Sequence, residues 1–290
     1  MIAVLAGARW VQFVSLMAVF GSCAYGLLLA RAKLAGPPDK PERLLFLIAA
    51  TLALFSAILW FCLIAGQMSG DWRSSIDPGT LQLTASATRF GRIFLVRLIG
   101  LVLLWFLCLS KGSNRFGICM LAGLLLVSLA PISHAAAAAG GDIAIAGAAN
   151  DAIHLLSAGF WLGGLMVLAL MLPQHGGEPK GLLGPLRLFS VWGTYVVALL
   201  VTTGLINSIS IVPAPAISFH NLYFRLLLLK FGLATAMIAL AALNRWRFAP
   251  AIRVGRHGAD RHLARSVGAE IALGVAAVGV AGFLGLIAPH

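Results

Sequence analysis

The chain has 290 residues, of which 60% are hydrophobic and only 10% are charged, and its mean hydropathy is +0.97. Because about a quarter of the residues of a soluble globular domain are charged, this composition excludes an ordinary soluble protein and indicates an integral membrane protein. The net charge of +12 does not indicate a nucleic-acid-binding protein, since the cations fall in alternate loops between apolar segments.

Apolar segments recur along the whole chain. A helix needs about 20 apolar residues to cross the hydrocarbon core of a bilayer, and about eight segments meet this length. In chain order the predicted spans are Trp10–Ala30, Leu44–Gly66, Phe90–Leu109, Phe116–Ser133, Ala152–Leu172, Phe189–Ile211, Tyr223–Leu243 and Ala269–Ile287. The predicted fold is therefore all-α, a polytopic membrane protein with about eight transmembrane helices.

The placement of the cations predicts the orientation of these spans. Four alternate loops hold most of the lysine and arginine residues. These are Arg31, Lys33, Lys40 and Arg43; Lys111 and Arg115; Lys180 and Arg187; and Arg245, Arg247, Arg253, Arg256, Arg261 and Arg265. By the positive-inside rule these loops are cytoplasmic, so both termini are predicted to lie outside, and the last loop is predicted to contact anionic headgroups.

The chain resembles two four-helix halves in tandem, residues 1–140 and 141–290. Phe90–Arg97 and Tyr223–Lys230 each place one cation near the mouth of a span and another five residues further in. Gln12, Ser15 and Gly21 of the first span also correspond to His154, Ser157 and Gly163 of the fifth. Because each half has an even number of spans, we predict two parallel repeats. Function is expected off-centre, since Gln12 stands in the place of His154.

Four of the seven histidines fall at the end of the bundle that the charge bias places outside. They are His134, His154, His220 and His290. A polar, metal-capable side chain at the membrane boundary is costly without a partner. His134 and His154 flank one Ala/Gly-rich connection, and Asp151 precedes His154 by three residues, so on a helix both share a face. Imidazole suits copper, zinc, iron and nickel, so we predict a metal site, for copper, at His134 and His154 with Asp151 in support.

Alternatives remain open for these residues. His154 could bond a backbone carbonyl, and Asp151 could cap the start of a helix, where a carboxylate is favoured. His220 lies in an external loop and His290 is the last residue, so each could be a solvated side chain rather than a ligand.

Sulfur side chains supply soft candidate ligands. Met68 lies just beyond the external end of the second span and is predicted to contact Cu(I), because thioether and thiolate groups select that ion. All four cysteines, Cys23, Cys62, Cys108 and Cys119, fall within predicted spans without close spacing. The sequence therefore predicts neither a disulfide framework nor a Cys-x-x-Cys motif.

Two cations lie well inside their predicted spans. Arg97 and Lys230 are about two turns from the external ends, where a charge must pair, face water or reach outward. We predict a pairing role, for which the external carboxylates include Asp151. No nucleotide-binding Gly-rich loop and no Ser/His/Asp arrangement occurs in the sequence, so no enzymatic activity is predicted.

Several of these segments resemble one membrane protein family. Asp151–Leu165 is similar to the His-Leu-Leu…Trp-x-Gly-Gly-Leu signature of the copper resistance protein D family. Ser133–Ala136, Tyr223–Lys230 and Ala242–Arg245 are similar to other segments of that family. The resemblance implies an inner-membrane protein with eight helices that moves copper ions from the periplasm to the cytoplasm. It also implies a periplasmic copper-binding partner, expected here to be a separate protein.

Two other functions remain open at this stage. External histidines are also suitable axial ligands for b-type haem in a membrane redox protein. Alternatively, the chain is a scaffold that docks a periplasmic copper protein and transports nothing. The oligomeric state, the transport direction and the oxidation state of copper are left open by the sequence.

Overall fold

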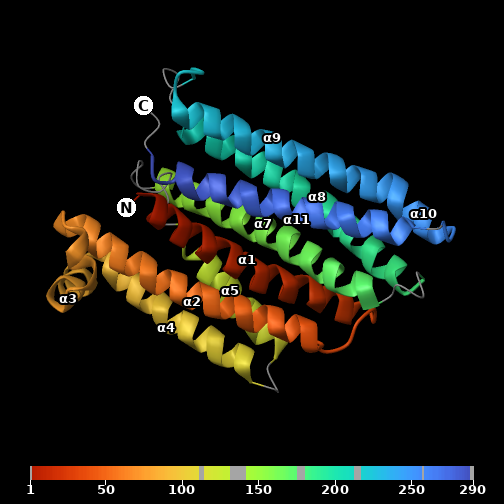
Figure 1. The fold of residues 1–290 in the computed structure, drawn as a ribbon, viewed down its shortest axis with the longest axis horizontal. Coiled ribbons are helices and arrows are strands. Elements are labelled where there is room, and N and C mark those ends of the chain that lie inside the picture. The colour runs from red at the N-terminus through yellow and green to blue at the C-terminus, as the bar shows by residue number, and fades with distance from the viewer. Residues whose placement is uncertain are drawn as a thin grey trace.

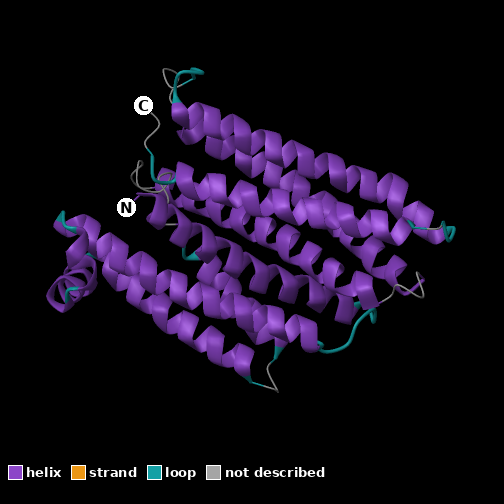
Figure 2. Ribbon diagram, in the orientation of Figure 1, coloured by secondary structure: helices purple, strands orange, loops and turns teal. Residues whose placement is uncertain are grey.

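The computed structural model describes residues 2–110, 114–130, 142–174, 180–211, 217–256 and 258–287. Within these ranges the regular elements are all helices, and the long helices run side by side in one bundle (Figure 2). The predicted all-α polytopic fold is therefore confirmed.

The helices follow the predicted spans but extend beyond most of them. They are α1 (Ile2–Arg31), α2 (Lys40–Ser69), the 3₁₀ helix η1 (Trp72–Ile76), α3 (Pro78–Ala87), α4 (Arg89–Leu109), α5 (Arg115–Val127), α7 (Asp142–Gln174), α8 (Lys180–Ile211), α9 (Leu222–Leu243), the π-helical turn η4 (Asn244–Phe248), α10 (Ala249–Arg253) and α11 (Ala259–Leu284). The described residues form seven helices long and apolar enough to cross a membrane, counting α9 through α10 as one. The predicted fourth span falls on α5, which has only 13 residues; the end of that span lies outside the described residues.

A short helix, α3, lies beside the C-terminal end of α2 and was not predicted. Asp77 caps its start: the backbone N–H and the hydroxyl of Thr80 donate to the Asp77 carboxylate at 2.7 and 2.8 Å. These hydrogen bonds lower the pKa of the Asp77 carboxyl. An N-cap aspartate followed by Pro78 is a recognised helix-start signal, but a helix of 10 residues is too short to show in a search for spans.

The helix α1 lies at the centre of the bundle, where it packs against α2, α5, α7 and α11 (Figure 1). It approaches α7 most closely at glycines. A Cβ atom added to Gly163 would lie 2.3 Å from the backbone nitrogen of Ser22, and one added to Gly21 would lie 1.8 Å from the carbonyl oxygen of Gly159. The hydroxyl of Ser22 donates to the carbonyl of Gly163 at 3.1 Å. Small residues permit such backbone contact, so α1 and α7 form the central pair.

A buried ion pair closes the end of the first half that carries the basic loops. Arg115, at the start of α5, donates to the carboxylate of Glu42, near the start of α2. The Arg115 guanidinium also lies against Gly26 of α1, where an added Cβ would be 2.4 Å from Nη1. The contacts of Arg115 therefore link α1, α2 and α5. Removal of either charged partner would destabilise the fold, because the other charge would remain buried and unpaired.

The α1–α7 contact predicts a strong effect of one added methyl group. Gly163→Ala should lower the thermal unfolding midpoint and the amount of folded protein in the membrane, since overpacking costs about 1–3 kcal/mol. Gly232→Ala, in α9, is the matched control because an added Cβ there meets nothing within 4 Å. Equal midpoints for the two variants in detergent would contradict the close approach.

Candidate functional site

The residue that the sequence placed at the centre of the metal site, His154, lies in α7. This helix begins at Asp142, so Asp151 is an interior helical residue rather than a cap. The interpretation that Asp151 caps a helix is therefore wrong, because it assumed a helix that starts at Ala152. Asn150 and Asp151 precede His154 by four and three residues, so both lie next to it on one side of the helix.

These three side chains reach across to α8. The Nδ1 atom of His154 lies 2.8 Å from the hydroxyl of Thr203. The Asn150 amide donates to the carbonyl of Thr203 at 3.0 Å and to the side-chain oxygen of Asn207 at 2.7 Å. Asn207 in turn donates to the Asp151 carboxylate at 2.7 Å. The five side chains form one hydrogen-bonded cluster, called here the α7–α8 polar cluster.

The α7–α8 polar cluster determines the tautomer of His154. The Thr203 hydroxyl has one hydrogen, which it donates to the carbonyl of Leu199 at 2.6 Å, as a helical threonine commonly does. It therefore accepts the bond from His154, so Nδ1 carries the proton of the neutral ring. The Nε2 atom is then unprotonated and has a lone pair for a ligand, which is the state in which neutral imidazole binds a metal ion.

A third helix brings a cation to the same place. Lys230 of α9 is half-buried and interacts electrostatically with both His154 and Asp151. Asp151 is the acid whose charge acts on Lys230, and a negative charge near an ammonium group lowers the cost of keeping it at membrane depth. The α7–α8 polar cluster and Lys230 therefore combine one neutral imidazole, one carboxylate and one ammonium group.

The other predicted ligands do not join this cluster in the described residues. His134 and His290 lie outside the described residues. His220 is exposed in the turn before α9, where its backbone N–H donates to the hydroxyl of Ser218 at 3.3 Å. Met68 is 57% exposed at the end of α2, a helix on the opposite side of the bundle from α8 and α9 (Figure 1). Among the described residues, no three His, Cys, Asp or Glu side chains are arranged to hold a metal ion.

The first half has polar contacts of the same kind but of different chemistry. Buried Gln12 of α1 accepts a hydrogen bond from Ser56 of α2 at 2.8 Å. Arg97, the predicted counterpart of Lys230, is 2% exposed and donates to the carbonyl of Leu125 at 2.7 Å and to the hydroxyl of Ser128. Arg97 thus binds the last turn of α5, where a cation is favoured by the helix dipole. Within the part of the chain that the structure describes, Arg97 forms no salt bridge, so these oxygen acceptors at the end of α5 provide its polar contacts.

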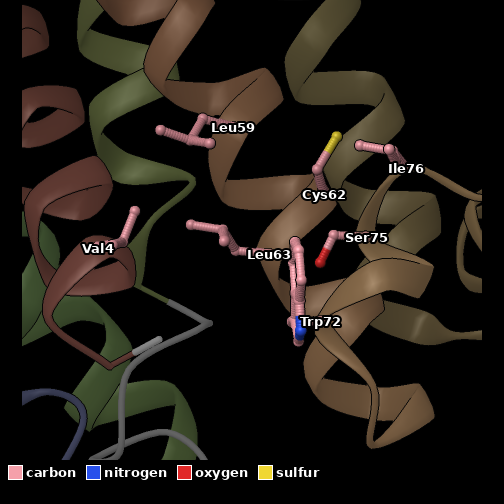
Figure 3. Close-up of a pocket in the computed structure, with 7 residues that line it drawn as sticks. All are labelled: Val4, Leu59, Cys62, Leu63, Trp72, Ser75 and Ile76. Atoms are coloured by element: carbon pink, nitrogen blue, oxygen red, sulfur yellow. The ribbon is translucent and has the colours of Figure 1, made fainter.

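A cavity of about 400 Å³ lies between α1, α2 and η1 (Figure 3). It is lined by Val4, Leu59, Cys62, Leu63, Trp72, Ser75 and Ile76. The thiol of Cys62 is the only sulfur group that lines it, and the remaining walls are mainly apolar. It is formed by helices of the first half, apart from the α7–α8 polar cluster, and the described residues that line it include no set of metal ligands.

Sequence comparisons connect the chain with copper proteins. Residues 1–145 match the family described as "Copper resistance protein D-like, N-terminal domain", and residues 184–284 match "Copper resistance protein D". The Copper resistance protein D of Pseudomonas syringae pv. tomato is 28% identical over 97% of this chain and 96% of its own length. The Inner membrane protein YebZ of Escherichia coli (strain K12) is 30% identical over 84% of both chains.

A third relative is a longer protein. The Copper transport protein CutJ of Bacillus subtilis (strain 168) is 27% identical over 92% of this chain but only 50% of its own length. This chain therefore spans half of that relative. No solved structure matches the chain.

The assigned tautomer of His154 leads to a stability prediction. Thr203→Val keeps the shape of the side chain but leaves the Nδ1–H of His154 without its acceptor, which costs about 1–3 kcal/mol for a buried donor. The thermal midpoint should fall, and the ring nitrogen shifts of His154 in ¹⁵N NMR should change. Thr203→Ser keeps the hydroxyl and should behave like the wild type. An unchanged midpoint and unchanged shifts in the valine variant would refute the assignment.

Proposed function

Because the chain belongs to the copper resistance protein D family, we propose that it carries copper across the bacterial inner membrane, from an outward-facing site at His154 toward the cytoplasm. Its relatives include proteins named for copper resistance, for copper transport and for the inner membrane, and it has at least seven helices of membrane-spanning length. The observation that carries the proposal is the contact of His154 Nδ1 with the hydroxyl of Thr203, which leaves the other ring nitrogen, Nε2, unprotonated.

We assign the other ligands from the sequence. In the sequence His134 lies between the end of α5 and the start of α7, so we propose that it supplies the second imidazole. Asp151 supports the site and offsets the combined charge of copper and Lys230. We propose His220 and His290 as outer contacts on the same side, and Met68 as a separate soft contact for Cu(I).

We propose that copper reaches this site on a separate periplasmic copper-binding protein. The outer segments between the helices of these 290 residues are short, and none carries a cluster of histidine and cysteine residues of its own. The lipid bilayer is the other partner, since the exposed helix surfaces are predominantly apolar. The names of the relatives favour copper over haem as the ligand of the external histidines.

The central prediction concerns His154. His154→Gln should abolish copper-dependent uptake with little loss of folded protein, because an amide can replace the imidazole hydrogen bond but is a poor copper ligand. His154→Leu should also lose about 1–3 kcal/mol of stability, because it leaves Thr203 without its partner. Copper uptake by cells and membrane abundance are measured together. His262→Gln is the control, since His262 stacks on Phe248 in the last basic loop region. Full uptake by His154→Gln would remove the central residue of the proposed site.

The orientation is tested separately. A reporter that is active only in the periplasm should be active when fused after His290, and silent when inserted near His257. A cytoplasmic reporter should give the opposite result at both positions. Activity of the periplasmic reporter at His257 would reverse the proposed direction of the bundle.

A further inference from the structure

Three of the four cysteines lie together in the core of the first half. Cys23 of α1, Cys108 of α4 and Cys119 of α5 are 0%, 9% and 3% exposed, and all three are free thiols. They belong to one hydrophobic cluster, and Cys23 interacts electrostatically with both of the others. The fourth cysteine, Cys62, lines the cavity at the outer end of α2.

The register of α1 against α5 places two of these thiols opposite each other. The two helices pack directly and run in opposite directions. One contact joins Gly26 to Arg115, and a second joins Phe20 to Gly123, where an added Cβ would lie 3.2 Å from the phenylalanine ring.

Both cysteines fall between these two contacts and on the contacting faces. Phe20, Cys23 and Gly26 follow one another at intervals of three residues on α1, and Cys119 is four residues from both Arg115 and Gly123 on α5. Residues spaced by three or four share a helix face. The thiols of Cys23 and Cys119 therefore face each other across the α1–α5 interface.

We propose that Cys23 and Cys119 form a second copper site, which receives Cu(I) from the His154 side and holds it between two thiolates before release to the cytoplasm. This inference rests on the proposed function. Thiolate groups select Cu(I), whereas imidazole accepts several metals, so the soft pair would retain only the reduced ion. Two ligands suffice for Cu(I), which forms stable complexes with a pair of thiolates.

The binding step is balanced in protons and charge. One Cu(I) ion replaces two thiol protons: two S–H bonds break, two Cu–S bonds form, two protons leave, and copper stays in the +1 state. A thiol that binds a metal ion is deprotonated outright. The product carries one net negative charge, and the nearby ion pair of Arg115 and Glu42 acts on Cys23 with charges of both signs.

The position of the pair fits a role in release. Cys119 lies one helical turn from Arg115, whose ion pair with Glu42 closes this end of the first half. That is the end to which the charge bias assigns the cytoplasmic loops. Copper would thus meet an imidazole nitrogen near the outer end and sulfur ligands near the inner end.

The test uses the purified full-length protein in detergent, with Cu(I) supplied under anaerobic conditions. Competition with a chromophoric Cu(I) chelator gives the affinity, and X-ray absorption counts the sulfur ligands. The wild type should bind Cu(I) through two sulfur atoms. Cys23→Ser and Cys119→Ser should each weaken binding by more than about tenfold, since loss of a residue that only hydrogen-bonds to a metal ligand already costs that much. Cys62→Ser, the same change in another span, should bind as the wild type does.

Folding is monitored by the thermal midpoint, and Cys23→Ala provides a second variant without a polar group. Wild-type protein whose bound Cu(I) has no sulfur ligand would overturn the thiol site, even if the variants fail to fold. Undiminished binding in both serine variants would do the same. His154→Gln separates the two proposals: it should bind Cu(I) at the thiols in detergent yet fail in uptake by cells. Normal uptake by that variant would overturn the His154 site and leave the thiol site intact.

Discussion

The backbone contact between α1 and α7 is the constraint on which the rest of the bundle depends. Lipid tails are as apolar as leucine, so helices in a bilayer associate through close packing and hydrogen bonds rather than through exclusion of water. Gly21, Gly159 and Gly163 allow α1 and α7, the two most deeply buried spans of the described residues, to contact each other backbone to backbone. The helices α2, α5, α8 and α11 pack on this pair, whereas α4 packs on α2 and α5, and α9 packs on α11. His154 lies nine residues before Gly163 on the same helix, or about 13 Å along its axis, so the glycine contact also determines the depth of the candidate site.

Both halves use the same kind of packing, which supports our proposal that residues 1–140 and 141–290 are parallel repeats. The α1–α7 contact brings Gly21 next to Gly163, two residues that correspond in the sequence. Gln12 bonds Ser56 between α1 and α2, much as His154 bonds Thr203 between α7 and α8. The halves also differ. The helix α2 packs on α4, whereas α9 packs on α11 without a comparable contact to α8 in the described residues.

The spans were predictable because hydropathy depends on local composition alone. Their ends were not, since helices continue past the hydrocarbon core: α7 starts at Asp142, ten residues before the predicted Ala152. His154 and Asp151 could be selected because polar groups at a membrane boundary are conspicuous. Their partners could not, because Thr203 and Asn207 are common polar residues whose separations of 49 and 56 residues from their partners carry no pattern. Helix packing places α8 beside α7, and this neighbour relation determines which side chains contact His154 and Asp151.

The charges around His154 suit a site that copper passes through rather than one that stores it. Lys230 and Asp151 offset each other near the ring, so the cluster can lie at membrane depth without a net charge. At the proposed site a copper ion on Nε2 would add a positive charge near the Lys230 ammonium group, and that repulsion would oppose tight retention. Transport requires binding that is strong enough for uptake and weak enough for release. In the first half Arg97 is instead held by the end of α5, so the equivalent cation has a structural role and the balance between attraction and repulsion exists only beside His154.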